Sequence, residues 1–189
     1  MQLKELYKVR KTVLEMVEDR GYKIPDDHAN LSYEDFVTTG LYDILFENNE
    51  GYLYVNFHNV QNSFGISDLV SVKEKVLEKT GNHETTIIVI VPNNPTSLKK
   101  ELVKPKYSMV NIFIYNNLKC NIARHKIQPK FKLLSKEEDK KRVLDMYSSK
   151  QSQLYQILID DPISKYFGAH KGDIFEVKRK DITVYRSVK

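Results

Sequence analysis

The chain of 189 residues contains no tryptophan and only one cysteine, Cys120. A single cysteine excludes an intrachain disulfide, so we expect a reducing, intracellular compartment. The longest uninterrupted apolar run, Ile87–Val91, has five residues and is far too short to span a membrane. Charges begin at Lys4 and Glu5, which leaves no apolar signal core at the N-terminus. We therefore predict no membrane partner.

The chain also lacks any clustering of metal ligands. Its five histidines, at positions 28, 58, 83, 125 and 170, are isolated and do not have ligand spacing. We predict no metal, no cofactor and no small-molecule substrate. His125 has no nucleophile or carboxylate near it in sequence, so a hydrogen-bonded structural role is favoured over a general base. Asp160 and Asp161 resemble a metal pair, but Pro162 follows directly and favours a helix cap.

Acidic residues are absent between Lys106 and Lys132. Residues 1–118 carry 13 Lys and Arg against 16 Asp and Glu, whereas residues 119–189 carry 17 against 9, a net charge of +8. This asymmetry indicates that the C-terminal part meets an acidic surface or nucleic acid, with a solvated basic surface as the simpler alternative. The acidic N-terminal part argues against broad phosphate binding there.

Hydrophobic spacing predicts an α+β fold in two domains, 1–118 and 119–189. The first is predicted to be an α/β domain, in which Leu69, Val70, Val76 and Leu77 of the second helix face the core. Its predicted elements are a helix over 2–20, a hairpin of Leu41–Phe46 and Tyr52–Phe57 around Asn48–Gly51, a helix that starts at Ser67 and is followed by Gly81, a central strand Thr85–Val91, a short helix from Ser97 and a strand near Val110–Tyr115.

The second domain is predicted to be a small α+β unit with a mixed sheet. Ser135 and Glu138 form a capping box for a helix through about Tyr147, with Val143 and Leu144 on its inner side. Two strands, Ile174–Arg179 and Ile182–Val188, end the chain.

A rigid platform is predicted between that helix and those strands. Asp161 caps a short helix, Pro162 takes its first position, Gly168 closes it in a left-handed conformation, and Gly172 turns the chain into the next strand. None of these residues brings catalytic chemistry.

The aromatic residues of the platform have two possible roles. Tyr166-Phe167 could stack on nucleobases, but the nearby Pro162 and Gly168 favour a split role. We expect Phe167 in the core, and Tyr166 and Lys171 at a protein interface.

Asp43 raises the alternative of a nuclease. Such sites need an acid on one strand and an acid-x-Lys on the next, to hold a metal and activate water. The partner segment Tyr54–His58 contains neither acid nor Lys. We therefore expect Asp43 to be a satisfied polar residue and the protein to have no catalytic residue.

The order Asp161-Pro162, Tyr166-Phe167-Gly168, Lys171-Gly172 and Tyr185-Arg186 resembles the C-terminal signature of the small subunit shared by eukaryotic nuclear RNA polymerases. Archaeal relatives of that subunit resemble residues 119–189 alone, without a jaw. Further landmarks of the family are similar here. They are Leu6–Thr12 and Asp19–Tyr22 of its opening helix, and Asn121–His125, Pro129 and Leu134–Glu138 of its route into the assembly domain.

The resemblance implies a non-catalytic subunit of a multisubunit DNA-directed RNA polymerase. Residues 119–189 would be the assembly domain that docks on the largest subunit, and residues 1–118 the lower jaw near downstream DNA, a nuclease-like core without an active site. The implied partner-binding residues are Asp161, Pro162, Tyr166, Gly168, Lys171, Gly172, Tyr185 and Arg186. The alternative is a stand-alone nucleic-acid-binding or transcription-regulatory protein.

The chain also departs from the family pattern. The connection Arg179–Asp181 is shorter than in relatives, and Gln153–Gln156 lacks a Pro and an Arg of the corresponding family segment. The chain is rich in Lys, Asn and Ile and short for a nuclear subunit. These features indicate a divergent version, encoded by a large DNA virus or an AT-rich protist, and located in the nucleus, or in a viral factory or virion.

Overall fold

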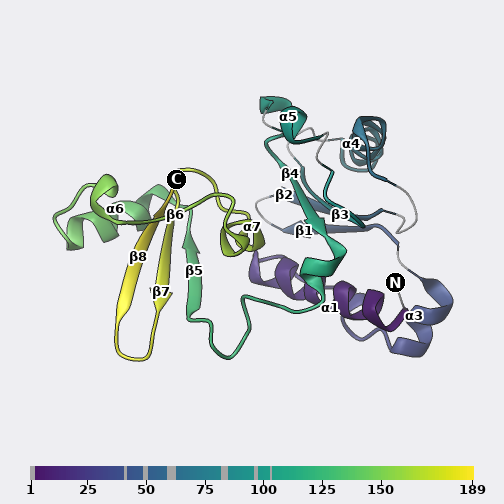
Figure 1. Ribbon diagram of the computed structural model, residues 1–189, viewed down its shortest axis with the longest axis horizontal. Helices are drawn as coiled ribbons and strands as arrows, with labels where there is room; N and C mark the ends of the chain where they lie inside the picture. Colours follow the sequence, from purple (N-terminus) through teal and green to yellow (C-terminus); the bar gives the residue numbers. More distant parts are fainter. Residues whose placement is uncertain are drawn as a thin grey trace. The chain divides into compact units, whose positions relative to one another are not determined.

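The computed structural model describes residues 3–40, 42–48, 51–58, 63–81, 85–95, 98–102 and 104–189. The chain divides into two compact units, Met1–Cys120 and Asn121–Lys189, and each is described by itself. The predicted α+β fold is confirmed, because each unit contains a four-stranded sheet with helices (Figure 1). None of the helices within these ranges is long and apolar enough to cross a membrane. Cys120, the last residue of the first unit, is exposed and not disulfide-bonded.

The first unit contains a sheet of strand order β1-β2-β3-β4. Strands β1 and β2 form the predicted antiparallel hairpin, and β3 is parallel to both of its neighbours. Its elements are α1 (Leu3–Asp19), α2 (Asp26–Ala29), α3 (Tyr33–Thr39), β1 (Ile44–Asn48), β2 (Gly51–Phe57), α4 (Ile66–Thr80), β3 (Thr86–Val91), α5 (Lys99–Leu102), β4 (Val110–Ile114) and 3₁₀ turns at Pro105–Tyr107 and Tyr115–Leu118. Leu41, the hairpin turn at 49–50, His83 and Ser97 lie outside the described residues.

Strand β3 is the central strand, as its composition predicts. Every residue from Ile87 to Val91 is at most 2% exposed. A parallel strand flanked on both sides and covered on both faces has no polar face, which explains the unbroken β-branched run. Figure 1 shows α4 and α1 on opposite sides of this sheet.

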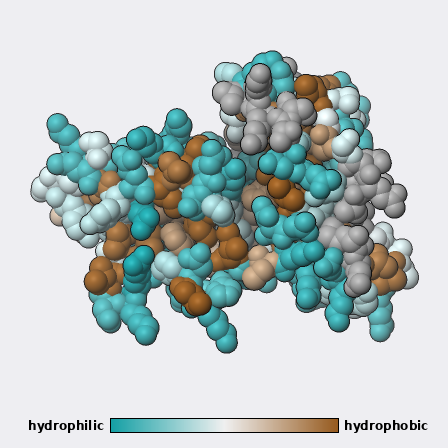
Figure 2. Space-filling view, viewed as in Figure 1, coloured by the Kyte–Doolittle hydropathy of each residue, from teal (hydrophilic) through white to brown (hydrophobic). Residues whose placement is uncertain are grey.

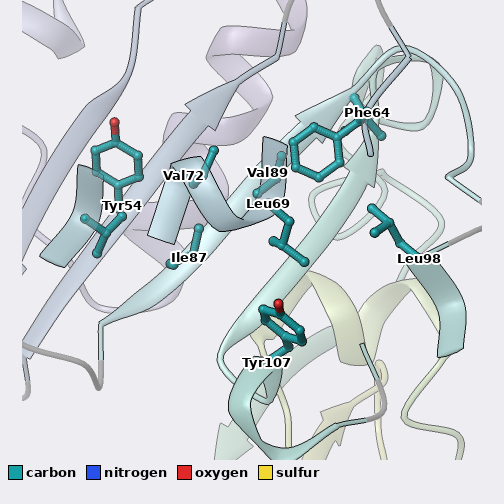
Figure 3. Packing of buried hydrophobic residues seen from close by; sticks show 10 residues of the cluster. Tyr54, Phe64, Leu69, Val72, Ile87, Val89, Leu98 and Tyr107 are labelled. Atoms are coloured by element: carbon teal, nitrogen blue, oxygen red, sulfur yellow. The ribbon is translucent and has the colours of Figure 1, made fainter. Parts of the chain in front are cut away.

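Helix α4 packs on the sheet through Leu69, Val72 and Val76, which form a core with the residues of Figure 3. The prediction that Val70 and Leu77 also face inward is wrong, because they are 41% and 37% exposed. At 100° per residue, positions 69, 72 and 76 lie on one stripe of the helix, whereas positions 70 and 77 lie together on its neighbouring flank.

Helix α1 confirms the predicted N-terminal helix, and its first residue, Leu3, is 47% exposed. Its buried side includes one charged residue, Arg10, which is 2% exposed. The guanidinium of Arg10 donates to the carbonyl of His28 at 3.1 Å and lies 3.4 Å from His28 Nδ1. This contact fastens α2 to α1. The short helices α2 and α3 were not predicted.

The second unit contains a mixed sheet of strand order β5-β7-β8-β6, as predicted. Strand β7 is antiparallel to both of its neighbours, β5 and β8, and the edge strand β6 runs parallel to β8. The elements are β5 (Lys130–Leu134), α6 (Glu137–Met146), a 3₁₀ turn at Gln151–Gln153, β6 (Tyr155–Ile157), α7 (Pro162–Phe167), β7 (Ile174–Lys178) and β8 (Thr183–Val188). Strands β7 and β8 were predicted, whereas β5 and β6 were not.

Different helices pack on the two faces of this sheet. On one face, Val143 of α6 packs against Leu134 and Ile174. On the other face, Ile163 of α7 and Phe175 of β7 belong to a second core. Its other buried members are Ile157, Ala169, Val177 and Val188. Alternation along each strand separates the two sets of side chains.

The predicted capping box at Ser135 is wrong. Helix α6 has Lys136 at its N-cap, without a side-chain hydrogen bond. Leu134 still pairs with Ile174 in the sheet, so the chain needs Ser135 and Lys136 to turn before the helix can begin. The acidic residues Glu137, Glu138 and Asp139 occupy the first turn, where they interact favourably with the helix dipole.

The contact between His28 and Arg10 predicts a loss of stability in mild acid. Burial lowers the pKa of His28 below its usual 6.5, partly offset by the charge of Asp27 and reinforced by that of Arg10. The unfolded chain then binds a proton at His28 more readily than the folded chain does. The contribution of neutral His28 to the free energy of unfolding is therefore complete above about pH 6.5 and is lost as the pH falls through the lower pKa of His28 in the folded chain. Between about pH 7.5 and pH 5.5, the melting temperature of His28→Gln should fall less than that of the wild type, as measured by thermal denaturation. Equal decreases would contradict this role of His28.

Candidate partner-binding site

Helix α7 begins as the sequence predicts. The Asp161 carboxylate accepts the backbone N–H of Ile163 at 2.8 Å, and Pro162 occupies the first helical position. The side chain therefore satisfies one of the N–H groups that a helix start leaves unpaired, and proline removes another. The helix-cap interpretation of Asp161 is confirmed. Asp160 instead lies 2.9 Å from the exposed Lys165 ammonium.

Helix α7 ends at Gly168, which has the predicted left-handed conformation (φ 66°, ψ 35°). The N–H of Gly168 donates to the carbonyl of Lys165 at 3.1 Å, and the N–H of Ala169 donates to that of Ser164 at 2.9 Å. A residue with a Cβ would be strained at this φ, so glycine permits the abrupt reversal after a helix of six residues.

The prediction that Tyr166 lies at the surface is wrong, whereas Phe167 packs against the core as expected. Tyr166 is 2% exposed, and its hydroxyl accepts a hydrogen bond from Asn121 Nδ2 at 2.9 Å. Phe167 is half-buried and packs its ring edge-on against Phe175, with 5.7 Å between centroids. In so short a helix the inward positions include both aromatic residues, and only Pro162 and Lys165 are fully outward.

Asp173 follows the predicted glycine turn and organises it, a role that the sequence did not predict. Its side chain is almost buried, and its Oδ2 accepts the backbone N–H of His170 at 2.8 Å. Its Oδ1 lies 3.4 Å from the ammonium of Lys140 on α6. The hydrogen bond to Glu137 and the charge of Asp173 raise the pKa of Lys140 against the effect of burial. Asp173 thereby joins the turn to α6.

The backbone of this turn is tied to the last strand. The N–H of Gly172 donates to the carbonyl of Val188, and the N–H of Val188 donates to the carbonyl of Asp173. Gln151 adds a hydrogen bond from its Nε2 to the carbonyl of Gly172 at 2.7 Å. Gly172 has a φ of 90°, so the predicted glycine turn is confirmed. Lys171 is exposed at its apex.

The structure does not bring all the predicted site residues together. Asp161, Pro162 and Gly168 belong to α7 or its caps, and Lys171 and Gly172 to the turn that follows. In β8, Arg186 pairs with Phe175 and Tyr185 pairs with Glu176, so these consecutive residues lie on opposite faces of the sheet. Arg186 is on the α7 face, whereas Tyr185 packs with the α6 core. Their roles in partner binding stay predictions.

The residues weighed for catalysis have structural contacts. The Asp43 carboxylate accepts hydrogen bonds from the Tyr54 hydroxyl at 2.7 Å, Asn56 Nδ2 at 2.9 Å and the Phe57 N–H at 3.2 Å, which confirms a satisfied polar residue. Burial and the contact with Asp43 raise the pKa of Tyr54. His125 is exposed and accepts the N–H of Ile127 at its Nδ1. Within the described residues, no group of three or more His, Cys, Asp or Glu is placed to hold a metal ion.

Comparison with known proteins identifies the family. Residues 1–104 match the N-terminal domain of RNA polymerase Rpb5, and residues 120–189 match its C-terminal domain. The chain is 29% identical to a DNA-directed RNA polymerase subunit 5-like protein of Arabidopsis thaliana, covering 96% of this chain and 92% of the relative. It is 28% identical to the RNA polymerases I, II and III subunit rpabc1 of Dictyostelium discoideum, covering 98% and 95%.

The fold and the site together define the class of protein. It is a two-domain α+β chain that carries the Asp-Pro platform in its second unit. The chain belongs to the RNA polymerase Rpb5 family, which confirms the resemblance drawn from its motifs.

The burial of Tyr166 predicts that its loss destabilises the chain. Tyr166→Ala should lower the free energy of unfolding by about 3–5 kcal/mol, because it removes a buried ring and leaves Asn121 without this acceptor. Lys165→Ala is the matched control on the outward side of the same helix and should change the free energy of unfolding by less than about 0.5 kcal/mol. Denaturant titration of the full chain measures both values, and similar small effects would contradict the burial of Tyr166.

Ser164 provides a second test of the packing under α7. It is fully buried, and its hydroxyl has no hydrogen-bond partner in the part of the chain that the structure describes. An unsatisfied buried hydroxyl costs about 1–3 kcal/mol, so Ser164→Ala should raise the melting temperature. Ser164→Val, which adds volume instead, should lower it. Destabilisation by the alanine variant would show that the hydroxyl is bonded.

Proposed function

We propose that this chain is a non-catalytic subunit of a multisubunit DNA-directed RNA polymerase. The observation that carries the proposal is the match to both Rpb5 domains in the same order, over residues 1–104 and 120–189. The relatives that cover nearly the whole chain are themselves named as DNA-directed RNA polymerase subunits. The hydrogen bonds that occupy the Asp43 carboxylate are compatible with a structural rather than a catalytic role.

Within that role we assign the two parts of the chain different tasks. Residues 119–189 are the assembly domain that docks on the largest polymerase subunit, and residues 1–118 are the lower jaw near downstream DNA. The docking assignment is supported by the rigidity of the platform, whose helix is capped at both ends and whose turn is bonded to α6 and β8. The location that follows is the nucleus. Encoding by a virus stays an untested prediction.

Outward groups of the platform are the proposed docking contacts. Pro162 and Lys171 are exposed, and Asp161, Gly168 and Gly172 are partly exposed. Tyr166 is buried and therefore supports this surface from beneath. Arg186 lies on the same face of the sheet as α7 and is partly exposed.

Purification of the tagged full-length chain from its source cells tests the proposed function. We expect the largest polymerase subunit to be recovered in equimolar amount, as quantified by mass spectrometry and size-exclusion chromatography. Recovery of the chain as a monomer, free of polymerase subunits, would contradict the proposal and favour a stand-alone nucleic-acid-binding protein.

Lys171→Glu tests the proposed docking surface. The exposed lysine makes no ion pair among the residues that the structure describes, so its reversal should leave the melting temperature unchanged. Recovery of the largest subunit should fall several-fold, because a reversed charge in an interface is repelled by the partner groups that the lysine meets. Lys141→Glu, an exposed lysine of α6, is the matched control and should not change recovery. Equal recovery with both variants would exclude Lys171 from the interface.

A further inference from the structure

Part of the second sheet lies beyond the helix that covers it. On the α6 face, Leu134 of β5 and Ile174 of β7 are paired and lie beneath Val143 of the helix. Helix α6 has only ten residues and packs over this end of the sheet. Alternation along the strands then places every second residue on the same face, farther from α6.

Those outer positions form two rows across the sheet. Strand register aligns Lys132 with Glu176 and Glu176 with Tyr185 in one row, and aligns Lys130 with Lys178 and Lys178 with Thr183 in the next. We define the basic face as the outer-row residues Lys130, Lys132, Lys178 and Tyr185, together with Arg142 of α6 and Tyr147 at the C-cap of that helix.

Positive charge dominates the basic face. Lys130 and Lys132 are exposed, and neither has an ion-pair partner in the part of the chain that the structure describes. Lys178 lies 3.0 Å from Glu176, but the lysine side chain is 61% exposed and the glutamate only 14%. The glutamate therefore lies beneath the cations and leaves their ammonium groups toward solvent.

An aromatic pair borders these cations. The ring of Tyr147, at the C-terminal end of α6, meets the ring of Tyr185 edge-on, with 5.6 Å between centroids. Tyr147 is 53% exposed, so one side of the pair faces solvent. Arg142, whose charge acts on Tyr185, has a side chain that is 66% exposed and 3.1 Å from Asp139.

We propose that the basic face binds single-stranded nucleic acid, with phosphates on Lys130, Lys132, Lys178 and Arg142 and a base stacked on Tyr147. Cations beside an exposed ring are the combination that sequence-tolerant single-strand binders use. An acidic protein segment would use the cations but has no need of the ring, and a duplex keeps its bases stacked inside. Figure 2 shows hydrophilic side chains at the free end of the sheet beside apolar ones.

This surface is separate from the proposed docking site. The platform helix α7 packs on the opposite face of the same sheet, through Ile163 and Phe167. A strand of nucleic acid on the basic face and a protein partner on α7 and its turn therefore use different residues, apart from Tyr185, which the family resemblance also assigns to partner binding. The binding surface does not require the polymerase, and the isolated full-length chain is sufficient to test it.

Fluorescence anisotropy with a labelled single-stranded oligothymidylate tests the proposal. Each phosphate contact contributes about −0.7 to the slope of log K against log salt, so four contacts predict a slope of about −3. In the triple variant Lys130→Gln, Lys132→Gln, Lys178→Gln, the slope should fall in magnitude by about 2. The substitution Lys178→Gln keeps a side-chain donor for Glu176. Melting curves verify that the triple variant is folded. Lys141→Gln with Lys150→Gln is the matched control from the same unit and should keep the wild-type slope.

The contribution of the Tyr147 ring to binding distinguishes a nucleic acid from a simple acidic ligand. Tyr147→Ala should weaken binding of the oligothymidylate roughly tenfold, while leaving the salt slope unchanged. Polyglutamate of similar charge should compete poorly, and its competition should not respond to Tyr147→Ala. No measurable binding near physiological salt, an unchanged slope in the triple variant, or equal competition by polyglutamate would each overturn the proposal. The last result would identify an acidic protein segment as the occupant.

Discussion

The buried carboxylate of Asp173 is the contact on which the second unit depends. The Asp173 side chain meets Lys140 of α6 and the His170 N–H after α7, and the backbone carbonyl of the same residue accepts the N–H of Val188, so Asp173 links α6, the turn after α7 and β8. A buried carboxylate is tolerated only where donors replace its water. Here the requirement for those donors fixes the turn that follows α7, and thereby the orientation of the helix itself.

In the second unit, the alternation of side chains along each strand creates two separate surfaces, one on each face of the sheet. Consecutive residues such as Tyr185 and Arg186 lie on opposite faces, so one strand contributes to two surfaces. One face carries α7 and the proposed docking residues, and the other carries α6 and the basic face. This separation also explains why the excess of positive charge in residues 119–189 does not have to serve a single partner. Charge on one face can meet nucleic acid while the opposite face meets protein.

Features encoded by neighbouring residues were predictable, and features that depend on distant contacts were not. The Asp161-Pro162 start and the Gly168 stop are local, and the apolar run of β3 reports burial on both faces. Strand β5 alternates Lys with apolar residues, a strand signal that was overlooked because it covers only five residues, whereas β6 has three residues at a sheet edge and no distinctive pattern. The inward position of Tyr166 depends on how α7 is turned by its neighbours, and the partners of Asp173 come from α6 and β8. The local sequence contains neither arrangement.

The exposed Cys120 has a consequence for work with the purified protein. It is the only thiol in the chain, and it stands at the end of the first unit. Two copies can therefore be joined by one interchain disulfide when reductant is omitted, whereas no scrambled isomers can form. A dimer that disappears with dithiothreitol is an oxidation product rather than an assembly state. The same thiol accepts a single maleimide dye or spin label without any substitution, and places that probe at the point in the chain where the first unit ends.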